Sequence, residues 1–221
     1  METGTEISLF IDKNEIDHMK KGSVANRTKA ITEATAAAGI KVEEPISFYE
    51  NGLAGDYLFV DWEKKAILVI DVKNSFEEVY KNLLQKRDFE RANKAITRSR
   101  IIAEKAREAG YDYYFVVLIA KDRYKTRDGR VVRPKRPADL MDLYECDPQK
   151  AKGWGLGDPE ELKQTGGERL VRKLEGLEAV GDVYTRFCSY KVVGHEVVRL
   201  VKALHKGRLE EEGIGVIDFV A

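Results

Sequence analysis

Residues 55–73 read GDYLFVDWEKKAILVIDVK, which is two apolar runs joined by a short polar segment. The second run, residues 66–73, is apolar on both faces until its end, as expected for a central strand that helices cover. The polar segment at residues 63–65 is suited to reverse the chain. The stretch therefore predicts an antiparallel hairpin whose buried second strand ends in Asp71 and Lys73.

Asp71 and Lys73 flank Val72, so strand alternation places the two charged side chains on one face and turns Val72 away. Charged groups at the end of a buried strand are costly unless they are paired or bind a metal. Asp56 begins the preceding strand, and in an antiparallel hairpin the beginning of one strand lies beside the end of the next. We expect the carboxylates of Asp56 and Asp71 to converge on one cation.

The register of this hairpin decides whether Asp56 shares the face of Asp71 and Lys73. A turn of two or four residues would place Asp56 opposite Lys73. A turn of three residues would place it opposite Val72 and direct its side chain away from the other two. We predict an even-numbered turn.

The rest of the chain alternates helical and extended patterns. The predicted elements are a helix at 27–38, strands at 45–50, 55–62 and 66–73, a helix at 75–109, a strand at 111–120, a helix at 196–209 and a strand at 214–220. This order predicts an α/β fold with a central mixed β-sheet flanked by helices. We expect a single domain over residues 1–221, with its core at about 23–120 and 191–221 and an insertion at about 121–190.

Glu33 lies in the first predicted helix. Ala30 and Ala37 lie on its side of that helix, and their small side chains would permit a close approach to the sheet. Glu33 is therefore a candidate fourth member of the acidic site. The alternative is an ordinary exposed helix glutamate.

A basic segment follows the strand predicted at 111–120. Asp128 and Gly129 in this segment are a strong signal for a tight hairpin turn. We expect the hairpin to bind DNA, because a two-stranded ribbon fits the major groove; the alternative is a solvated hairpin without a partner. The basic side chains expected to contact DNA are Lys125, Arg127, Arg130, Arg133, Lys135 and Arg136.

The composition of the 221-residue chain, 43% hydrophobic and 34% charged, is typical of a folded protein. Its 38 basic and 38 acidic residues balance, so net charge neither favours nor excludes a nucleic-acid partner. Cys146 and Cys188 show no disulfide or zinc pattern, which suits a reducing interior. Without an apolar signal segment or a run of about 18 apolar residues, we expect a cytoplasmic protein and no membrane partner.

A helix that carries Glu33, followed by Gly55 and Asp56 and then by the triplet at residues 71–73, resembles the core of the PD-(D/E)xK nuclease superfamily. The resemblance covers roughly residues 23–120. Gly55 stands where many members carry proline. The resemblance implies a restriction-endonuclease-like core, here with a C-terminal insertion.

By this resemblance, Asp56, Asp71 and the carbonyl of Val72 would bind Mg²⁺, the implied cofactor. Lys73 would orient or activate the attacking water and offset phosphate charge. Glu33 would assist the water or a second metal ion. Mg²⁺ is usually held by one or two carboxylates together with waters and substrate phosphate, which agrees with this set.

The resemblance implies a metal-dependent DNA endonuclease that hydrolyses phosphodiester bonds. The chain exceeds a minimal core by about a hundred residues that could read sequence, which favours sequence-specific double-strand cleavage of the type II restriction kind, usually by a homodimer. One alternative is a DNA repair or junction-resolving nuclease that uses the same site. Another is a non-catalytic nucleic-acid-binding module that keeps the fold, in which Asp71 and Lys73 are a partly buried ion pair.

Overall fold

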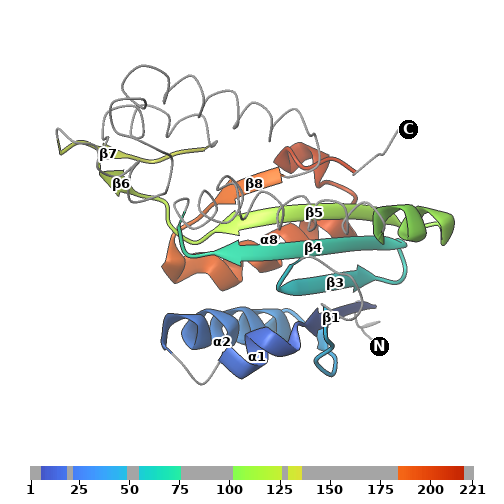
Figure 1. Cartoon of the computed structure of the whole chain (residues 1–221). Helices are drawn as coiled ribbons and strands as arrows, with labels where there is room; N and C mark the ends of the chain where they lie inside the picture. Colours follow the sequence, from blue (N-terminus) through green and yellow to red (C-terminus); the bar gives the residue numbers. More distant parts are fainter. Residues whose placement is uncertain are drawn as a thin grey trace, which may run out of the picture.

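The computed structural model describes residues 6–18, 22–48, 55–75, 102–125, 129–135 and 184–216. Their main feature is a six-stranded mixed sheet (Figure 1). Its strands in spatial order are β2 (Lys41–Val42), β1 (Ile7–Ile11), β3 (Tyr57–Asp61), β4 (Ala66–Lys73), β5 (Asp112–Ile119) and β8 (Tyr184–Phe187). β3 is antiparallel to both of its neighbours, and the other pairs are parallel. The predicted α/β class with a central mixed sheet is confirmed.

Two helices, α2 (Gly22–Ala37) and α8 (Val193–His205), pack together over one face of the sheet. The buried core on this face includes Leu68, Ile70 and Val72 of β4 and residues of both helices. A Cβ atom at Gly194 would lie 2.5 Å from the carbonyl oxygen of Ala30. Glycine therefore permits the close approach of α8 to α2.

The remaining described elements are short. They are α1 (Lys13–His18), the strands β6 (Tyr124–Lys125) and β7 (Val131–Val132), and the 3₁₀ helices η2 (Tyr190–Val192) and η3 (Glu210–Glu212). Residues 102–108 are also helical, and they form the described end of the helix predicted at 75–109. Within the described residues, every helix is too short or too polar to span a bilayer.

The β3–β4 turn has four residues, 62–65, because Asp61 pairs with Ala66. The predicted even-numbered turn is therefore confirmed. The ladder ends where Tyr57 pairs with Ile70, and the N–H of Asp56 donates to the carbonyl of the same Ile70. The predicted pairing of Asp56 with Lys73 is therefore wrong, but the Asp56 side chain still reaches β4, where its Oδ2 accepts the N–H of Val72.

The sheet also differs from the predicted order. The strand expected at residues 45–50 is wrong in its described part, where Ile46 makes only an isolated bridge to Asp12. Its place beside β3 is taken by β1, which precedes both described N-terminal helices. The predicted elements lack this strand, although the alternation of Ile7, Leu9 and Ile11, all buried, is a signal for it.

Two further differences concern the C-terminal half. β8 lies within the segment expected as an insertion, and it extends the main sheet by pairing with β5. Residues 214–216 form no strand, and the remainder of the strand expected at 214–220 lies outside the described residues. The sheet therefore recruits strands from both sides of residues 23–120.

Candidate metal centre

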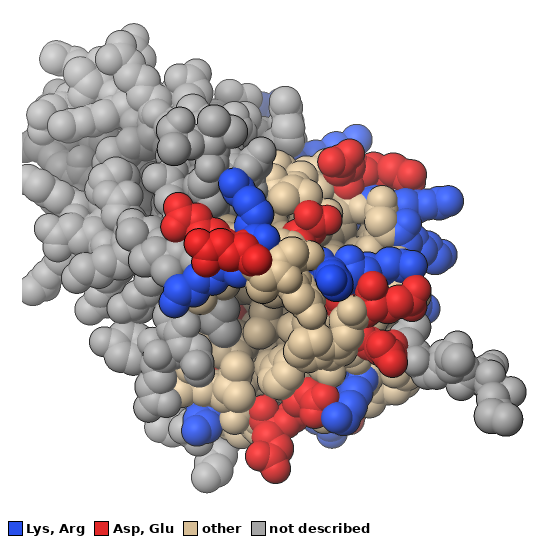
Figure 2. Space-filling view, turned by 90° about the vertical axis from the view of Figure 1, so that its right-hand side faces the viewer, with Lys and Arg blue, Asp and Glu red and all other residues tan. Residues whose placement is uncertain are grey.

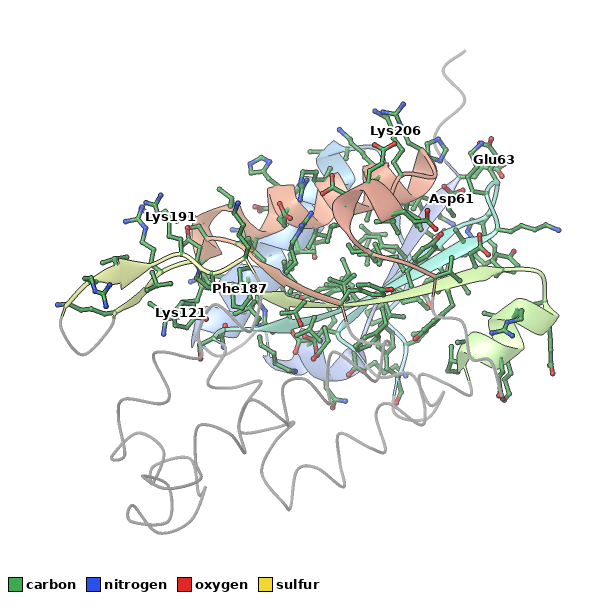
Figure 3. All side chains as sticks on the ribbon, turned by 90° about the horizontal axis from the view of Figure 1, so that it is seen from above. Asp61, Glu63, Lys121, Phe187, Lys191 and Lys206 are labelled. Carbon is green, nitrogen blue, oxygen red and sulfur yellow. The ribbon has the colours of Figure 1, made fainter. Side chains whose placement is uncertain are left out.

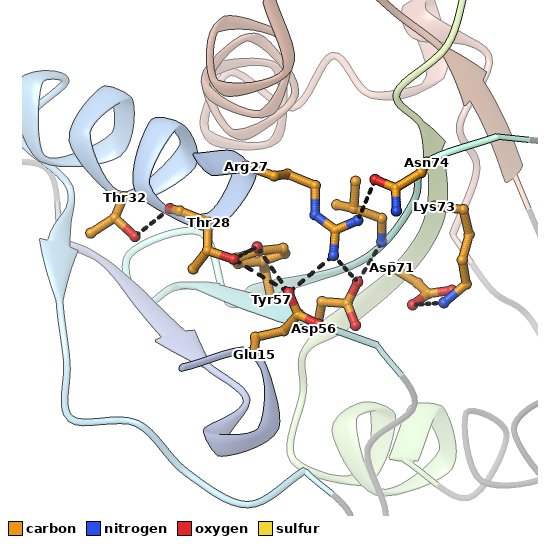
Figure 4. Close-up of polar contacts among 10 residues, drawn as sticks. Glu15, Arg27, Thr28, Thr32, Asp56, Tyr57, Asp71, Lys73 and Asn74 are labelled. Atoms are coloured by element: carbon orange, nitrogen blue, oxygen red, sulfur yellow. Dashed lines mark hydrogen bonds and ion pairs between the residues drawn. The ribbon is translucent and has the colours of Figure 1, made fainter. Parts of the chain in front are cut away.

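Asp71 and Lys73 form an ion pair at the carboxyl end of β4, with 2.8 Å between Lys73 Nζ and Asp71 Oδ1 (Figure 4). Their side chains are 18% and 21% exposed, so both are mostly buried but reachable from solvent. Both lie on the sheet face opposite α2 and α8, because the intervening Val72 is part of the core under those helices. Strand parity thus produces the predicted juxtaposition.

Asp56, the residue just before β3, is fixed by backbone and side-chain hydrogen bonds. Its N–H donates to the carbonyl of Ile70 at 3.0 Å, and its own carbonyl accepts the N–H of Asp12 at 3.1 Å. Its Oδ2 accepts the N–H of Val72 at 2.7 Å. The carboxylate thus satisfies a backbone donor of β4 beyond the last β3–β4 ladder pair.

Gly55 explains how the chain reaches this position. Its φ is 152°, and a Cβ atom there would lie 2.4 Å from Cγ1 of Val69. Proline fixes φ near −65°, so it does not fit the backbone found before Asp56. The glycine at this position therefore follows from local geometry.

A buried polar cluster, which sequence reasoning missed, lies behind Asp56 (Figure 4). Arg27 of α2 is 4% exposed, and its Nη2 lies 3.0 Å from Oε2 of Glu15 and 3.8 Å from Oδ2 of Asp56. The same Glu15 oxygen accepts hydrogen bonds from the hydroxyls of Thr28 at 3.3 Å and Tyr57 at 3.5 Å. We call Glu15, Arg27, Thr28 and Tyr57 the Arg27 cluster.

The signal for the Arg27 cluster was weak but present. Arg27, Ile31 and Thr35 are buried, and they recur every four residues on one face of α2. A charged residue in such a stripe requires a buried partner. That partner, Glu15, lies on α1, a helix of six residues that the apolar periodicity does not predict.

Glu33 does not join this centre. It lies two residues from Ile31, which is about 200° around the helix, and its side chain is 66% exposed. It forms an i,i+4 pair with Lys29 at 3.7 Å. Glu33 is therefore an ordinary exposed helix glutamate. The face of α2 that packs against the sheet contains Arg27 and Ile31, and Glu33 lies on another side of the helix.

The electrostatics of the centre are unfavourable without a cation. Burial, and then the nearby charge of Asp71, raise the pKa of Asp56 well above its usual range; Lys73 and Arg27 lower it less than these raise it. A divalent cation between the two carboxylates would remove the repulsion. The charge distribution therefore fits a metal ligand.

The hydrogen bonds leave one oxygen of each carboxylate available to bind a cation. Oδ2 of Asp56 is bonded to Val72, and Oδ1 of Asp71 to Lys73. Among the described residues, Oδ1 of Asp56 and Oδ2 of Asp71 have no hydrogen-bond partner. Two half-fixed carboxylates are a donor set that suits Mg²⁺.

The Val72 carbonyl points to the β3 side of β4 and not to β5. The N–H of Ala120 donates to the carbonyl of Lys73 at 2.8 Å, so the backbone of Lys73 faces β5. Because backbone groups alternate sides along a strand, those of Val72 face β3. In the described part of the chain, no group of three or more His, Cys, Asp or Glu side chains could hold a metal, so a metal bound by Asp56 and Asp71 would also need this carbonyl and water.

The basic hairpin β6–β7 leaves the sheet beside this centre (Figure 1). Lys73 pairs with Ile119 of β5. Tyr124, where β6 begins, follows Ile119 by five residues, which limits the distance between Ile119 and Tyr124 to roughly 17 Å. Tyr124 is buried and packs edge-on against Phe187, with 6.2 Å between ring centroids. Its neighbour Lys121 lies 4.5 Å above the same ring.

Lys125 pairs with Val131 in this hairpin, and Asp128 of the predicted tight turn lies outside the described residues. Gly129 has a φ of 85°, as a turn glycine should. The DNA-contact candidates Lys125, Arg130, Arg133 and Lys135 are exposed, whereas Arg127 and Arg136 lie outside the described residues.

Charge is distributed unequally between the two ends of the molecule. Figure 3 places Lys121, Phe187 and Lys191 at the hairpin end and Asp61, Glu63 and Lys206 at the other. Figure 2, which faces that other end, shows basic and acidic side chains next to one another. In the described hairpin segment, residues 121–125 and 129–135, only Asp122 opposes the basic side chains. The centre thus lies at the more basic end.

Other candidate chemistry is structural. His205 Nδ1 lies 2.7 Å from Oδ2 of the fully buried Asp61, whose Oδ1 accepts the N–H of Lys64 at 2.9 Å. This pair ties α8 to the β3–β4 turn. Burial raises the pKa of the Cys188 thiol to about 12, so it is a poor nucleophile.

Neither protein-family models nor curated protein sequences gave a match to this chain. The fold and the geometry of the centre therefore carry the functional argument.

Proposed function

We propose that the protein is a Mg²⁺-dependent deoxyribonuclease of the PD-(D/E)xK kind that hydrolyses phosphodiester bonds. The observation that carries the proposal is the arrangement of Asp56 and Asp71. Each carboxylate is held through one oxygen, the other oxygen has no hydrogen-bond partner among the described residues, and Lys73 lies alongside. A purely structural ion pair between Asp71 and Lys73 needs no third charged group. The nearby Asp56 carboxylate would then only destabilise the folded protein.

In this proposal Asp56, Asp71 and the Val72 carbonyl hold the ion. Mg²⁺, when bound, stabilises the charge that grows on phosphate oxygens during an in-line displacement. Lys73 holds Asp71 through Oδ1, and its ammonium group offsets phosphate charge and orients water for attack. The Asp56 side chain is positioned by the Val72 N–H.

We propose duplex DNA as the substrate because the exposed basic side chains of the β6–β7 hairpin lie at the same end as the centre. Phosphate contacts of this kind position the duplex. Cleavage of both strands at one sequence would use two copies of the chain, which makes a homodimer part of the proposal. Light scattering of the protein with and without a duplex tests that part.

The decisive experiment is incubation of supercoiled plasmid with the purified protein and MgCl₂, with EDTA in a parallel reaction. We expect cleavage with Mg²⁺ that EDTA abolishes. The Asp71→Asn variant should lose at least about 100-fold in rate, because it keeps the shape but removes a metal-binding charge. Discrete fragments would identify a sequence-specific enzyme, and a smear an unspecific one.

The matched control is Glu63→Gln. Glu63 is an exposed acid, 57% accessible, in the turn of the β3–β4 hairpin, at the end away from Asp71. It should cleave like the wild type. Linear duplex, single strand, flap and junction substrates separate a restriction-type enzyme from a repair or junction nuclease. Absence of Mg²⁺-dependent cleavage on all of these forms would refute the proposal and favour a non-catalytic nucleic-acid-binding module.

A further inference from the structure

One nitrogen of Arg27 lies between two carboxylates that come from different elements. Its Nη2 is 3.0 Å from Oε2 of Glu15 on α1 and 3.8 Å from Oδ2 of Asp56 at the start of β3 (Figure 4). Glu15 is 13% exposed and Asp56 is 16% exposed, so both carboxylates are mostly removed from solvent. Arg27 therefore compensates the charges of two carboxylates that are poorly screened by solvent.

A pair of acids of this kind is what a second metal ion would require. In hydrolytic sites with two metals, the ions lie about 3.5–4 Å apart and act together on the attacking and leaving oxygens. One ion would be bound by the carboxylates of Asp71 and Asp56, and the other by those of Asp56 and Glu15. The position between Glu15 and Asp56 already contains the Arg27 guanidinium.

We propose that Arg27 takes the place of a second metal ion, so that the centre holds one divalent cation. This inference rests on the metal centre of the proposed function. In it, Arg27 is a positioning residue that fixes Asp56 Oδ2, and Oδ1 remains for the single ion.

The surroundings of Arg27 hold it in this place. Its Nη1 donates to Oδ1 of Asn74 at 3.3 Å, and the Glu15 oxygen that it contacts also accepts hydrogen bonds from Thr28 and Tyr57. Among the described residues its Nε has no hydrogen-bond partner. The position of the guanidinium thus satisfies the two Nη atoms and leaves Nε without a partner there. Arginine stays charged at any physiological pH, which makes it a permanent cation in this position.

The charge balance agrees with one ion. Three carboxylates, those of Glu15, Asp56 and Asp71, face two cationic side chains, Arg27 and Lys73, and leave one net negative charge. One divalent cation converts this to one positive charge, which matches the single charge of a phosphodiester. Two divalent cations would leave three positive charges in a partly buried site.

The test is isothermal titration of the full chain with MnCl₂, without DNA, so that binding is measured apart from activity. We expect one Mn²⁺ per chain for the wild type. Arg27→Met should bind a second ion, because the Glu15 and Asp56 carboxylates lose their cation. Arg27→Met combined with Glu15→Gln should return to one ion, and Arg27→Lys, which keeps the charge, should also bind one.

Two ions in the wild type, or one ion in a folded Arg27→Met variant, would overturn the inference. The wild-type stoichiometry keeps it falsifiable where Arg27→Met fails to fold, which circular dichroism reveals. Absence of any Mn²⁺ binding to the wild type would refute the metal centre and this inference with it. One bound Mn²⁺ without DNA cleavage would refute the proposed activity alone and support the inference.

Discussion

The backbone N–H of Val72 donates a 2.7 Å hydrogen bond to Oδ2 of Asp56. The ladder between β3 and β4 ends at Tyr57 and Ile70, so the Asp56 side chain takes the role of a backbone acceptor beyond it. This bond fixes the carboxylate in one orientation beside the end of β4. A carboxylate that is also a backbone partner is placed more firmly than an exposed one.

Replacing Asp56 by asparagine should change how stability depends on pH. Burial and Asp71 raise the folded-state pKa of Asp56, so the folded protein binds this proton more tightly than the unfolded chain. The stability from this group is complete below the unfolded pKa of about 3.9, and it is lost as the pH rises through the folded pKa. Without metal, Asp56→Asn should therefore be the more stable protein at neutral pH.

Urea unfolding in EDTA at several pH values measures this difference. The stability advantage of Asp56→Asn should shrink as the pH is lowered toward about 4. Excess MgCl₂ should stabilise the wild type but not the variant, because only a charged Asp56 contributes to the ion. An advantage that grows with falling pH would contradict the assignment.

Replacing Lys73 by methionine should impair cleavage more than metal binding. The 2.8 Å ion pair with Asp71 would be lost, but both carboxylates proposed to bind the metal would remain. We expect the cleavage rate under single-turnover conditions to fall by about 100-fold or more, with Mn²⁺ still bound. Lys202→Met, an exposed lysine of α8, is the matched control, and equal rates in the two variants would exclude the role given to Lys73.

Replacing Gly55 by alanine should destabilise the protein and displace Asp56. A Cβ atom there would lie 2.4 Å from Val69 Cγ1 at a φ of 152°, and the strain should cost roughly 1–3 kcal/mol. Urea unfolding and Mn²⁺ titration measure the two effects. Gly110→Ala is the comparison, since its φ is 77° with nothing within 4 Å; it should lose stability but keep Mn²⁺ affinity.

Removal of the Asp61 carboxylate should affect stability and leave the metal centre intact. Asp61 is fully buried, pairs with His205 and accepts the Lys64 N–H, so Asp61→Ala leaves buried polar groups without partners. We expect a loss of about 2–4 kcal/mol in urea unfolding. Glu63→Ala in the same turn should stay within about 0.5 kcal/mol of the wild type. A loss of Mn²⁺ binding in a folded Asp61→Ala protein would show that the two sites are coupled.

The basic hairpin should bind DNA phosphates. Replacing the exposed Arg130 and Arg133 by alanine should weaken duplex binding and reduce the slope of log affinity against log salt concentration by about two, because each phosphate that a basic side chain neutralises adds about 0.9 to this slope. Fluorescence anisotropy over a range of NaCl concentrations measures the slope. Lys206→Ala with Arg208→Ala, at the opposite end of the molecule, should leave it unchanged. An unchanged slope in the hairpin variant would show that these arginines do not contact DNA phosphates.

Local rules were sufficient for part of the centre. The alternation of residues along β4 predicts that Asp71 and Lys73 share a face and that Val72 enters the core, and burial agrees. The parity of the β3–β4 turn could be argued from the polar residues at 63–65. Which residue lies opposite Asp56 could not be argued in this way, because moving the turn by one position keeps its parity but shifts the pairing by two residues.

The Arg27 cluster could not be predicted in the same way. Arg27 lies 12 positions from Glu15 and 47 from Asn74 in sequence, and charged helix residues are usually solvated. Glu33 was the better candidate by its alanine neighbours, but the rotation of α2 about its axis faces Arg27 and Ile31 toward the sheet. Helix rotation depends on packing against β3 and α8, which no local pattern contains.

The sequence alone thus determined the mixed α/β fold, the hairpin of β3 and β4, and the common face of Asp71 and Lys73, because side-chain period and turn parity are local properties of the chain. Only the tertiary structure decided that β1 pairs with β3, that Glu15 and Arg27 lie behind Asp56, and that Asp56 lies beside Asp71. Those relationships depend on long-range strand pairing and on helix packing, where chain segments far apart in sequence are brought together by burial of a shared core.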